Sequence, residues 1–195
     1  MQLLNVFYSY LNLGFHHIVD INGFDHLLFI ITLCAVYEIT EWRKVAIVIT
    51  AFTLGHSVTL ALASLKIILP NRYIIELLIP VTILISGIFN LFSINGKLKK
   101  TKLLAKYLMA LFFGLIHGMS FSNFFTDLMG DSTRIIFPLF SFNVGIEVGQ
   151  LLVLFIYYFV VNLFYKFAKV SYQKIALFFS ALGILVSIFL IFYRI

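Results

Sequence analysis

Six apolar stretches dominate the chain, and each is long enough to cross a lipid bilayer as a helix. Such a helix needs about 20 mostly apolar residues, because a rise of about 1.5 Å per residue must cover roughly 30 Å of hydrocarbon. The stretches are residues 22–38, 44–65, 73–92, 103–121, 136–165 and 174–192. The sequence therefore predicts an all-α membrane protein, a polytopic bundle of about six transmembrane helices.

Residues 1–195 are expected to form a single transmembrane domain. The bundle covers 22–192, and its short connections favour antiparallel neighbours. Segment 1–21 precedes the first span, and we expect it to lie at the outer interface or to fold into the outer leaflet as a re-entrant piece.

The composition separates this chain from soluble and nucleic-acid-binding proteins. Apolar residues make up 62% and charged residues 11%, a balance that ordinary soluble domains do not show. The net charge is +6, but the basic residues lie between apolar runs and are not interleaved with aromatic residues on a polar surface. We expect contact with lipid head groups and no nucleic acid.

Lysine and arginine are unevenly divided between the two ends of the predicted bundle. One end carries ten: Arg43, Lys44, Lys97, Lys99, Lys100, Lys102, Lys106, Lys166, Lys169 and Lys174. The other end carries Lys66, Arg72, Arg134 and Arg194. Because cytoplasmic loops hold the excess of positive charge, the first end is predicted to be cytoplasmic and both termini non-cytoplasmic.

Ionisable groups within the apolar segments are few, and they are functional candidates because an unpaired one in hydrocarbon costs several kcal/mol. All five histidines and four acids lie in or next to these segments: His16, His17, His26, His56, His117, Asp20, Asp25, Glu76 and Glu147. Counted from the predicted outer ends, His26, His56 and His117 fall in one layer of the outer half. His16 is interpreted as interfacial.

The fifth predicted span carries two patterns on different faces. Asn143, Glu147 and Gln150 are spaced i, i+4 and i+7, so they share one face, which we expect to look inward. Gly145 and Gly149 are four residues apart, a pattern that lets another helix approach closely.

Imidazole and carboxylate groups together suit first-row metals such as Zn, Ni, Co or Fe. His56 and His117 have the strongest case as ligands, since each lies within a span beside a small residue. The segments FTLGHS (52–57) and FGLIHG (113–118) are alike. We attribute the likeness to a shared local need for a small residue beside a buried imidazole, and not to an internal repeat. A purely structural polar network is the alternative to a metal site.

Four motifs in order along the chain resemble those of the HupE/UreJ family of bacterial membrane proteins: HHIVDINGFDHLLF (16–29), FTLGHSVTLALA (52–63), FGLIHGMSF (113–121) and FNVGIEVGQL (142–151). The resemblance implies a secondary permease for nickel or cobalt in the bacterial cytoplasmic membrane. It implies the metal ligands His17, Asp25, His26, His56, His117 and Glu147. Asp20, Glu76, Asn143 and Gln150 would then surround and orient these ligands.

Two further functions remain open from the sequence. One is a metal-dependent intramembrane hydrolase that acts on a lipid or a membrane-anchored peptide, with Zn or Fe and with Glu147 or Asp25 as general base. The other is a non-catalytic membrane subunit in which the polar groups only hold helices together.

Overall fold

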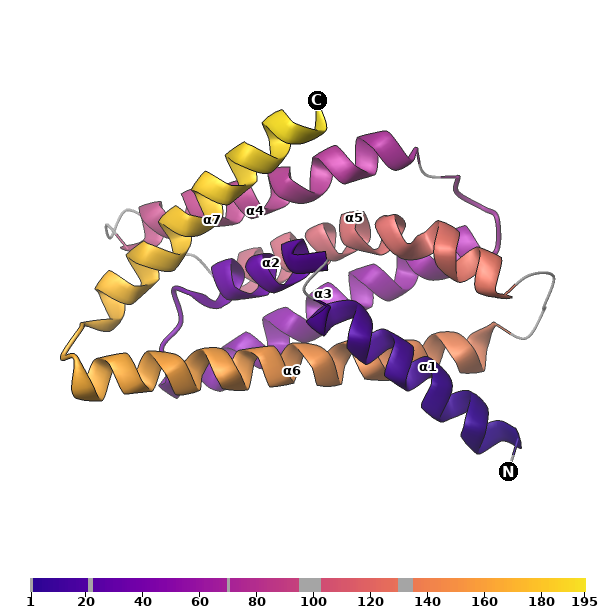
Figure 1. Cartoon of the computed structure of the whole chain (residues 1–195), viewed down its shortest axis with the longest axis horizontal. Coiled ribbons are helices and arrows are strands. Elements are labelled where there is room, and N and C mark those ends of the chain that lie inside the picture. The colour runs from indigo at the N-terminus through magenta and orange to yellow at the C-terminus, as the bar shows by residue number, and fades with distance from the viewer. Residues whose placement is uncertain (1, 21–22, 70, 95–102, 130–134) are drawn as a thin grey trace.

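A computed structural model of the chain describes residues 2–20, 23–69, 71–94, 103–129 and 135–195. These residues form helices and no strand: α1 (Gln2–Val19), α2 (Phe24–Cys34), the short η2 (Ile39–Glu41), α3 (Trp42–Ser64), α4 (Arg72–Ile94), α5 (Leu103–Met129), α6 (Ile136–Phe167) and α7 (Tyr172–Arg194). Helices α3 to α7 are long and apolar enough to cross a membrane, and α1 with α2 makes a sixth candidate span if the two are one broken span. The prediction of an all-α polytopic bundle is confirmed (Figure 1).

The first predicted span, 22–38, is wrong as a single continuous helix. α2 has only 11 residues, about 16 Å at helical rise, which is half of a bilayer core. It follows α1 at an angle of 70°, and Gly23, at the start of α2, has a non-helical backbone with φ of −100° and ψ of 39°. Residues 21 and 22 lie outside the described part of the chain. The expected span 22–38 is therefore replaced by a shorter helix, Phe24–Cys34, which follows a bend after α1.

Two helices run in parallel and touch at glycines, α3 and α5. A Cβ on Gly55 would meet the carbonyl oxygen of Leu111, and a Cβ on Gly114 would meet that of Phe52. The two backbones are thus so close that neither position has room for a side chain. This crossing sets His56 and His117 side by side on adjacent helices.

A second parallel pair, α1 and α6, is built in the same way. Gly14 lies against the Phe142 carbonyl and Gly145 against the Leu11 carbonyl, while Gly149 faces Ile18. The close approach predicted from Gly145 and Gly149 is confirmed, and its partner is the N-terminal helix. α1 therefore packs against α6 and crosses it obliquely (Figure 1).

The remaining long helices, α4 and α7, run antiparallel with α2 beside them (Figure 1). Gly87 of α4 lies 3.0 Å, measured from an added Cβ, from the Ser180 carbonyl of α7. At the far end of α7, Arg194 donates to the Glu76 carbonyl at 2.6 Å. α7 therefore ends where α4 begins.

Alternation of the helices fixes which charged residues share an end of the bundle. The described basic residues fall into the two groups expected from the sequence: Arg43, Lys44, Lys106, Lys166, Lys169 and Lys174 at one end, and Lys66, Arg72 and Arg194 at the other. Lys97, Lys99, Lys100, Lys102 and Arg134 lie outside the described residues. The N-terminal end of α1 and the C-terminal end of α7 are at the same end as Lys66.

Large apolar side chains cover the outside of the bundle and aromatic residues fill its centre. Phe155, Phe178 and Phe189 are 69%, 62% and 65% exposed, which in water would be unfavourable and in lipid is not. Phe29 and Phe142 are fully buried in the core. The molecule therefore has the surface of a protein surrounded by lipid.

Candidate metal site

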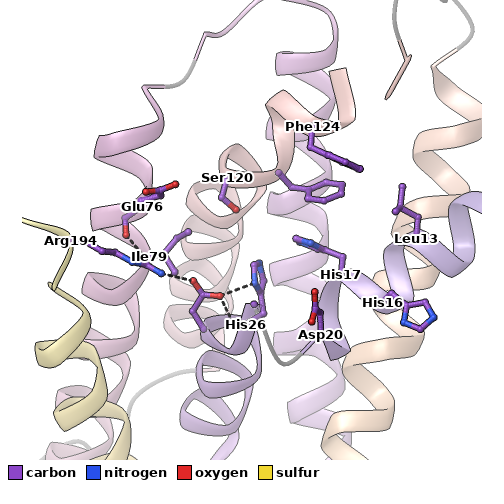
Figure 2. A pocket seen from close by; sticks show the side chains of 13 residues that line it. Leu13, His16, His17, Asp20, His26, Glu76, Ile79, Ser120, Phe124 and Arg194 are labelled. Carbon is purple, nitrogen blue, oxygen red and sulfur yellow. Dashed lines mark hydrogen bonds and ion pairs between the residues drawn. The ribbon is translucent and has the colours of Figure 1, made fainter. Parts of the chain in front are cut away.

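A cavity of about 510 Å³ enters the bundle at the end where α4 begins and α7 ends. Its walls come from α1, α2, α4, α5 and α7, and its polar lining includes His16, His17, Asp20, Asp25, His26, Glu76 and Arg194. Figure 2 shows His17 and His26 pointing toward one another from either side of the bend between α1 and α2. The bend thus delivers two histidines to the inner wall of the cavity.

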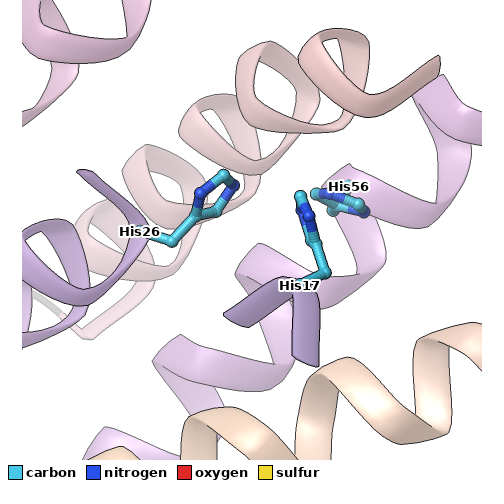
Figure 3. A group of neighbouring side chains, drawn as sticks. All are labelled: His17, His26 and His56. Atoms are coloured by element: carbon cyan, nitrogen blue, oxygen red, sulfur yellow. The ribbon is translucent and has the colours of Figure 1, made fainter. Parts of the chain in front are cut away.

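Three histidines converge at the inner end of this cavity. His17, His26 and His56 each offer a ring nitrogen, and these nitrogens lie within 4.8 Å of one another (Figure 3). A metal held at about 2.1 Å by three tetrahedral nitrogens would place them roughly 3.4 Å apart. Small rotations of the rings would therefore close the cluster around a cation.

Most ring nitrogens of this cluster are buried and have no hydrogen-bond partner. His17 Nε2, His26 Nε2 and both nitrogens of His56 are buried and unpaired, and the His56 side chain is fully inaccessible. Buried polar groups are nearly always paired, since leaving one unpaired costs about 1–3 kcal/mol. Several unpaired ring nitrogens within 4.8 Å of one another are typical of a cation site.

His117 stands beside the cluster as a fourth imidazole. Its ring centre is 5.2 Å from that of His26, and its Nε2 is 2.9 Å from Thr82 Oγ1. Thr82 already donates its one hydroxyl proton to the Ile79 carbonyl at 2.7 Å, so His117 Nε2 must be the donor in this bond. In the neutral ring the unpartnered Nδ1 then carries a lone pair and can bind a cation.

Asp25 is the acid closest to the cluster, and it has two neighbours. Its Oδ1 lies 3.3 Å from His26 Nδ1, without the angle of a hydrogen bond, and its Oδ2 lies 3.3 Å from the Arg194 guanidinium. A carboxylate beside Nδ1 favours the tautomer with Nδ1 protonated, which leaves Nε2 of His26 as the ligand atom. Arg194 balances the carboxylate's charge.

Comparison with protein families identifies the family of this chain. A family model described as HupE / UreJ protein matches residues 2–194. The chain belongs to the HupE/UreJ family. Neither the curated proteins nor the solved structures contain a significant match to it. The family is linked to nickel and cobalt transport, and the match extends over all the helices that build the histidine cluster.

The structure of this HupE/UreJ protein places Glu147 away from the three histidines. Its two carboxylate oxygens accept hydrogen bonds from Thr50 at 2.7 Å and from Thr53 at 2.5 Å, and Gln150 lies 2.9 Å from Thr53. Glu147 and Asn143 line a separate cavity of about 540 Å³ between α3 and α6. The face that they share thus looks toward α3, and the cluster forms without it.

Of the acids expected around the ligands, Asp20 and Glu76 line the cavity that leads to the histidines. Glu76 forms an exposed ion pair with Arg72 at 2.7 Å. Two residues at the site were missed by sequence reasoning. Thr82 was one threonine among many in apolar helices, and Arg194 was counted only as a charge at the end of a span; no local pattern marks either one.

Thr53→Val should lower the free energy of unfolding of this HupE/UreJ protein by about 1–3 kcal/mol, because it leaves Glu147 and Gln150 without their shared hydroxyl in the bundle. Metal binding should not change. Unfolding in detergent, followed by the fluorescence of the single tryptophan Trp42, measures the effect.

Thr59→Val is the matched control on the same helix, since the Thr59 hydroxyl bonds only to carbonyls of its own helix, at 3.3 and 3.2 Å. It should cost less than about 1 kcal/mol. Equal losses in the two variants would contradict a role for the Thr53 hydroxyl in joining α3 to α6.

Proposed function

We propose that this HupE/UreJ protein is a secondary permease for a divalent transition-metal ion, nickel or cobalt by its family, and that the whole chain works as one transmembrane unit. The observation that carries the proposal is the convergence of unpaired nitrogens from His17, His26 and His56. Nitrogen ligands suit Ni²⁺ and Co²⁺, which prefer imidazole to water or carbonyl oxygen. The metal ion is here the transported substrate.

The charge around the proposed site suits a permease that must also release its ion. The three imidazoles bind as neutral ligands, and the nearest carboxylate, Asp25, is neutralised by Arg194. A divalent ion at the site therefore keeps most of its charge in a low-dielectric environment, which limits its affinity. Protonation of the imidazole ligands would lower their affinity for the metal ion and so help its release.

The position of the cavity indicates the end of the bundle from which the metal ion enters. It opens at the end of the bundle that carries the fewer basic residues and both termini, and we propose that this end faces away from the cytoplasm. Asp20 and Glu76 at its walls would draw cations from that side.

The two alternatives receive less support from this geometry. The hydrolase would need a general base beside the metal, whereas Glu147 binds two threonines at another cavity and Asp25 is paired with Arg194. A structural network would pair its histidine nitrogens, and these nitrogens are unpaired.

Equilibrium binding of Ni²⁺ and Co²⁺ to the detergent-purified protein tests the proposal. We expect about one reversibly bound ion per chain, and a fall in affinity of at least about 100-fold in His56→Ala, since a ligand contributes no less than the groups that orient it. His17→Ala should show the same loss. It is the second variant because His17 is only half-buried and its replacement leaves a smaller void.

His16→Ala is the matched control, because His16 is exposed and its nitrogens are not part of the cluster. It should bind metal like the wild type. A folded wild type that binds neither ion, or a folded His17→Ala protein with unchanged affinity, would contradict the proposal. Uptake of nickel into proteoliposomes then tests transport itself.

A further inference from the structure

Two short sequence patterns each occur twice, at fixed separations. LNLGFHH (11–17) and LFFGLIH (111–117) share leucine, glycine and histidine 100 residues apart. FTLG (52–55) and FNVG (142–145) share phenylalanine and glycine 90 residues apart. These separations relate α1 to α5 and α3 to α6.

The same separations relate the contacts of the four glycines at the two parallel crossings. A Cβ on Gly14 would meet Phe142 and Ile146, and the positions related to these, Phe52 and His56, are what a Cβ on Gly114 would meet. The other two glycines behave in the same way: a Cβ on Gly145 would meet Leu11 and Phe15, and a Cβ on Gly55 would meet the related positions Leu111 and Leu115. The histidine rings are also equivalent, because His17 contacts Phe142 and His117 contacts the related Phe52. Chance similarity of short motifs would not reproduce atom-level contacts.

The two crossings run in opposite directions through the bundle. α3 and α6 are antiparallel, since Thr50 and Thr53 bond to Glu147 near the middle of both helices and Leu65 lies near Ile135. α4 and α7 are also antiparallel, and their bounds, 72–94 and 172–194, again differ by 100. The three relations together describe one two-fold axis perpendicular to the helices, which for membrane-spanning helices lies in the plane of the membrane.

The chain is therefore arranged as an inverted repeat: the bent pair α1 and α2, then α3 and α4, correspond to α5, α6 and α7. In transporters built this way the substrate site lies near the axis, one half contributes a broken helix, and the two halves exchange conformations to open the site at either end. This chain has the first two of these properties: the histidine cluster lies where the equivalent positions His17 and His117 meet, and α1 with α2 forms the broken helix. The open cavity at one end thus requires a route to the other.

Buried polar side chains mark that route along one face of α4. Thr82, which holds His117, is followed at i+4 and i+8 by Ser86 and Asn90, all at most 3% exposed. Asn90 donates to the Thr32 carbonyl at 2.6 Å and lies 3.1 Å from Ser180 Oγ, so it joins α2, α4 and α7. Thr32 Oγ1 is buried there without a partner.

This row of polar groups leads toward a second cavity at the opposite end of the bundle. The cavity has a volume of about 180 Å³, and Glu38, Ser93 and Gln173 are among its lining residues. Ser93 lies three residues beyond Asn90 on α4. Hydroxyls and amides in hydrocarbon are unfavourable unless they serve packing or a polar substrate, and this row lies on α4 between Thr82, which bonds to His117, and Ser93 at the far cavity.

We infer that the metal ion leaves the histidine cluster between α2, α4 and α7, past Ser86 and Asn90, when the inverted repeat opens at the end that carries Glu38. The inference rests on the proposed function, because it assigns the exit of the same ion. Asn90 closes this route in the structure by its bonds to α2 and α7, and its side chain becomes accessible when the route opens.

Nickel uptake by proteoliposomes and equilibrium nickel binding, measured on the same preparations, test the route. Asn90→Leu should lower uptake at least about tenfold and leave binding within about twofold of the wild type, because only the barrier to release is raised. Ser86→Ala should lower uptake and Ser141→Ala should not. Both serines are buried and bond to a carbonyl of their own helix, at 2.9 and 2.8 Å, but Ser141 lies off the route.

Normal uptake by a nickel-binding Asn90→Leu protein would overturn the route. Failure of the folded wild type to bind or take up either nickel or cobalt would instead overturn the proposed function, so the two failures are distinguishable. If Asn90→Leu does not fold, Asn90→Cys in a Cys34→Ala background replaces it, because Cys34 is the chain's single cysteine. A membrane-impermeant thiol reagent should then react from the Glu38 end, faster with nickel, and absence of reaction in a folded, nickel-binding protein would overturn the inference.

Discussion

Gly114→Leu is expected to leave almost no folded protein in the membrane. A Cβ at this position would overlap the Phe52 carbonyl oxygen and lie 2.9 Å from its carbon, both of which are backbone atoms that cannot rotate away. Relief requires α3 and α5 to separate, which breaks the packing that positions His56 and His117. We expect a loss of more than about 3 kcal/mol of stability, above the usual cost of overpacking.

The yield of monodisperse protein after detergent extraction, and the midpoint of its thermal unfolding, measure this effect. Gly23→Ala is the control, since a Cβ at Gly23 meets nothing within 4 Å and its φ is negative. It should unfold within a few degrees of the wild type. Wild-type stability in Gly114→Leu would show that the two helices are not in contact at this crossing.

Asp25→Asn and Arg194→Gln are expected to change metal affinity in opposite directions. Asp25 supplies a negative charge 3.3 Å from His26 Nδ1, so its loss should weaken Ni²⁺ or Co²⁺ binding at least about tenfold. Arg194 supplies the positive charge that opposes the metal ion, and its loss should strengthen binding by a similar factor. Titration calorimetry at low ionic strength measures both constants.

The double variant serves as the internal control, because it restores the balance of charge and should bind within a few-fold of the wild type. A purely structural role for the pair predicts something else: each single variant would lose stability and metal affinity together. Weaker binding in Arg194→Gln would therefore contradict the electrostatic account.

The spans could be predicted from the sequence because bilayer thickness imposes a minimum apolar length, and α3 to α7 all satisfy it. The bend at Gly23 could not. The segments on either side of the break, α1 and α2, pass the length and hydropathy test for a span together, and hydropathy does not report where such a span bends. Sequence patterns likewise set the depth of a residue better than its direction.

At the candidate site, too, the sequence predicted the depth of the residues better than the direction of their side chains. His26, His56 and His117 were expected in one layer from their depths, and the structure brings their rings together with that of His17. Glu147 was expected with them. However, α6 packs on both α1 and α3, so a residue that points into the bundle from α6 can face either helix, and Glu147 faces α3. The repeat was missed because the patterns that its halves share, Leu-x-x-Gly-x-x-His and Phe-x-x-Gly, are short and sit among apolar residues, and because the resemblance of FTLGHS to FGLIHG pointed to a different separation.

The pairing of α1 with α6 also governs the order in which the molecule is completed during synthesis. The face of α1 that carries Gly14 leaves the ribosome well before the helix that it fits, which begins at Ile136. While the three long helices α3, α4 and α5 are inserted, this face has no permanent partner and must be held by lipid, by the insertion machinery or by a temporary neighbour. The first bend of the metal path, beside His17, is thus among the last parts of the protein to take its final form.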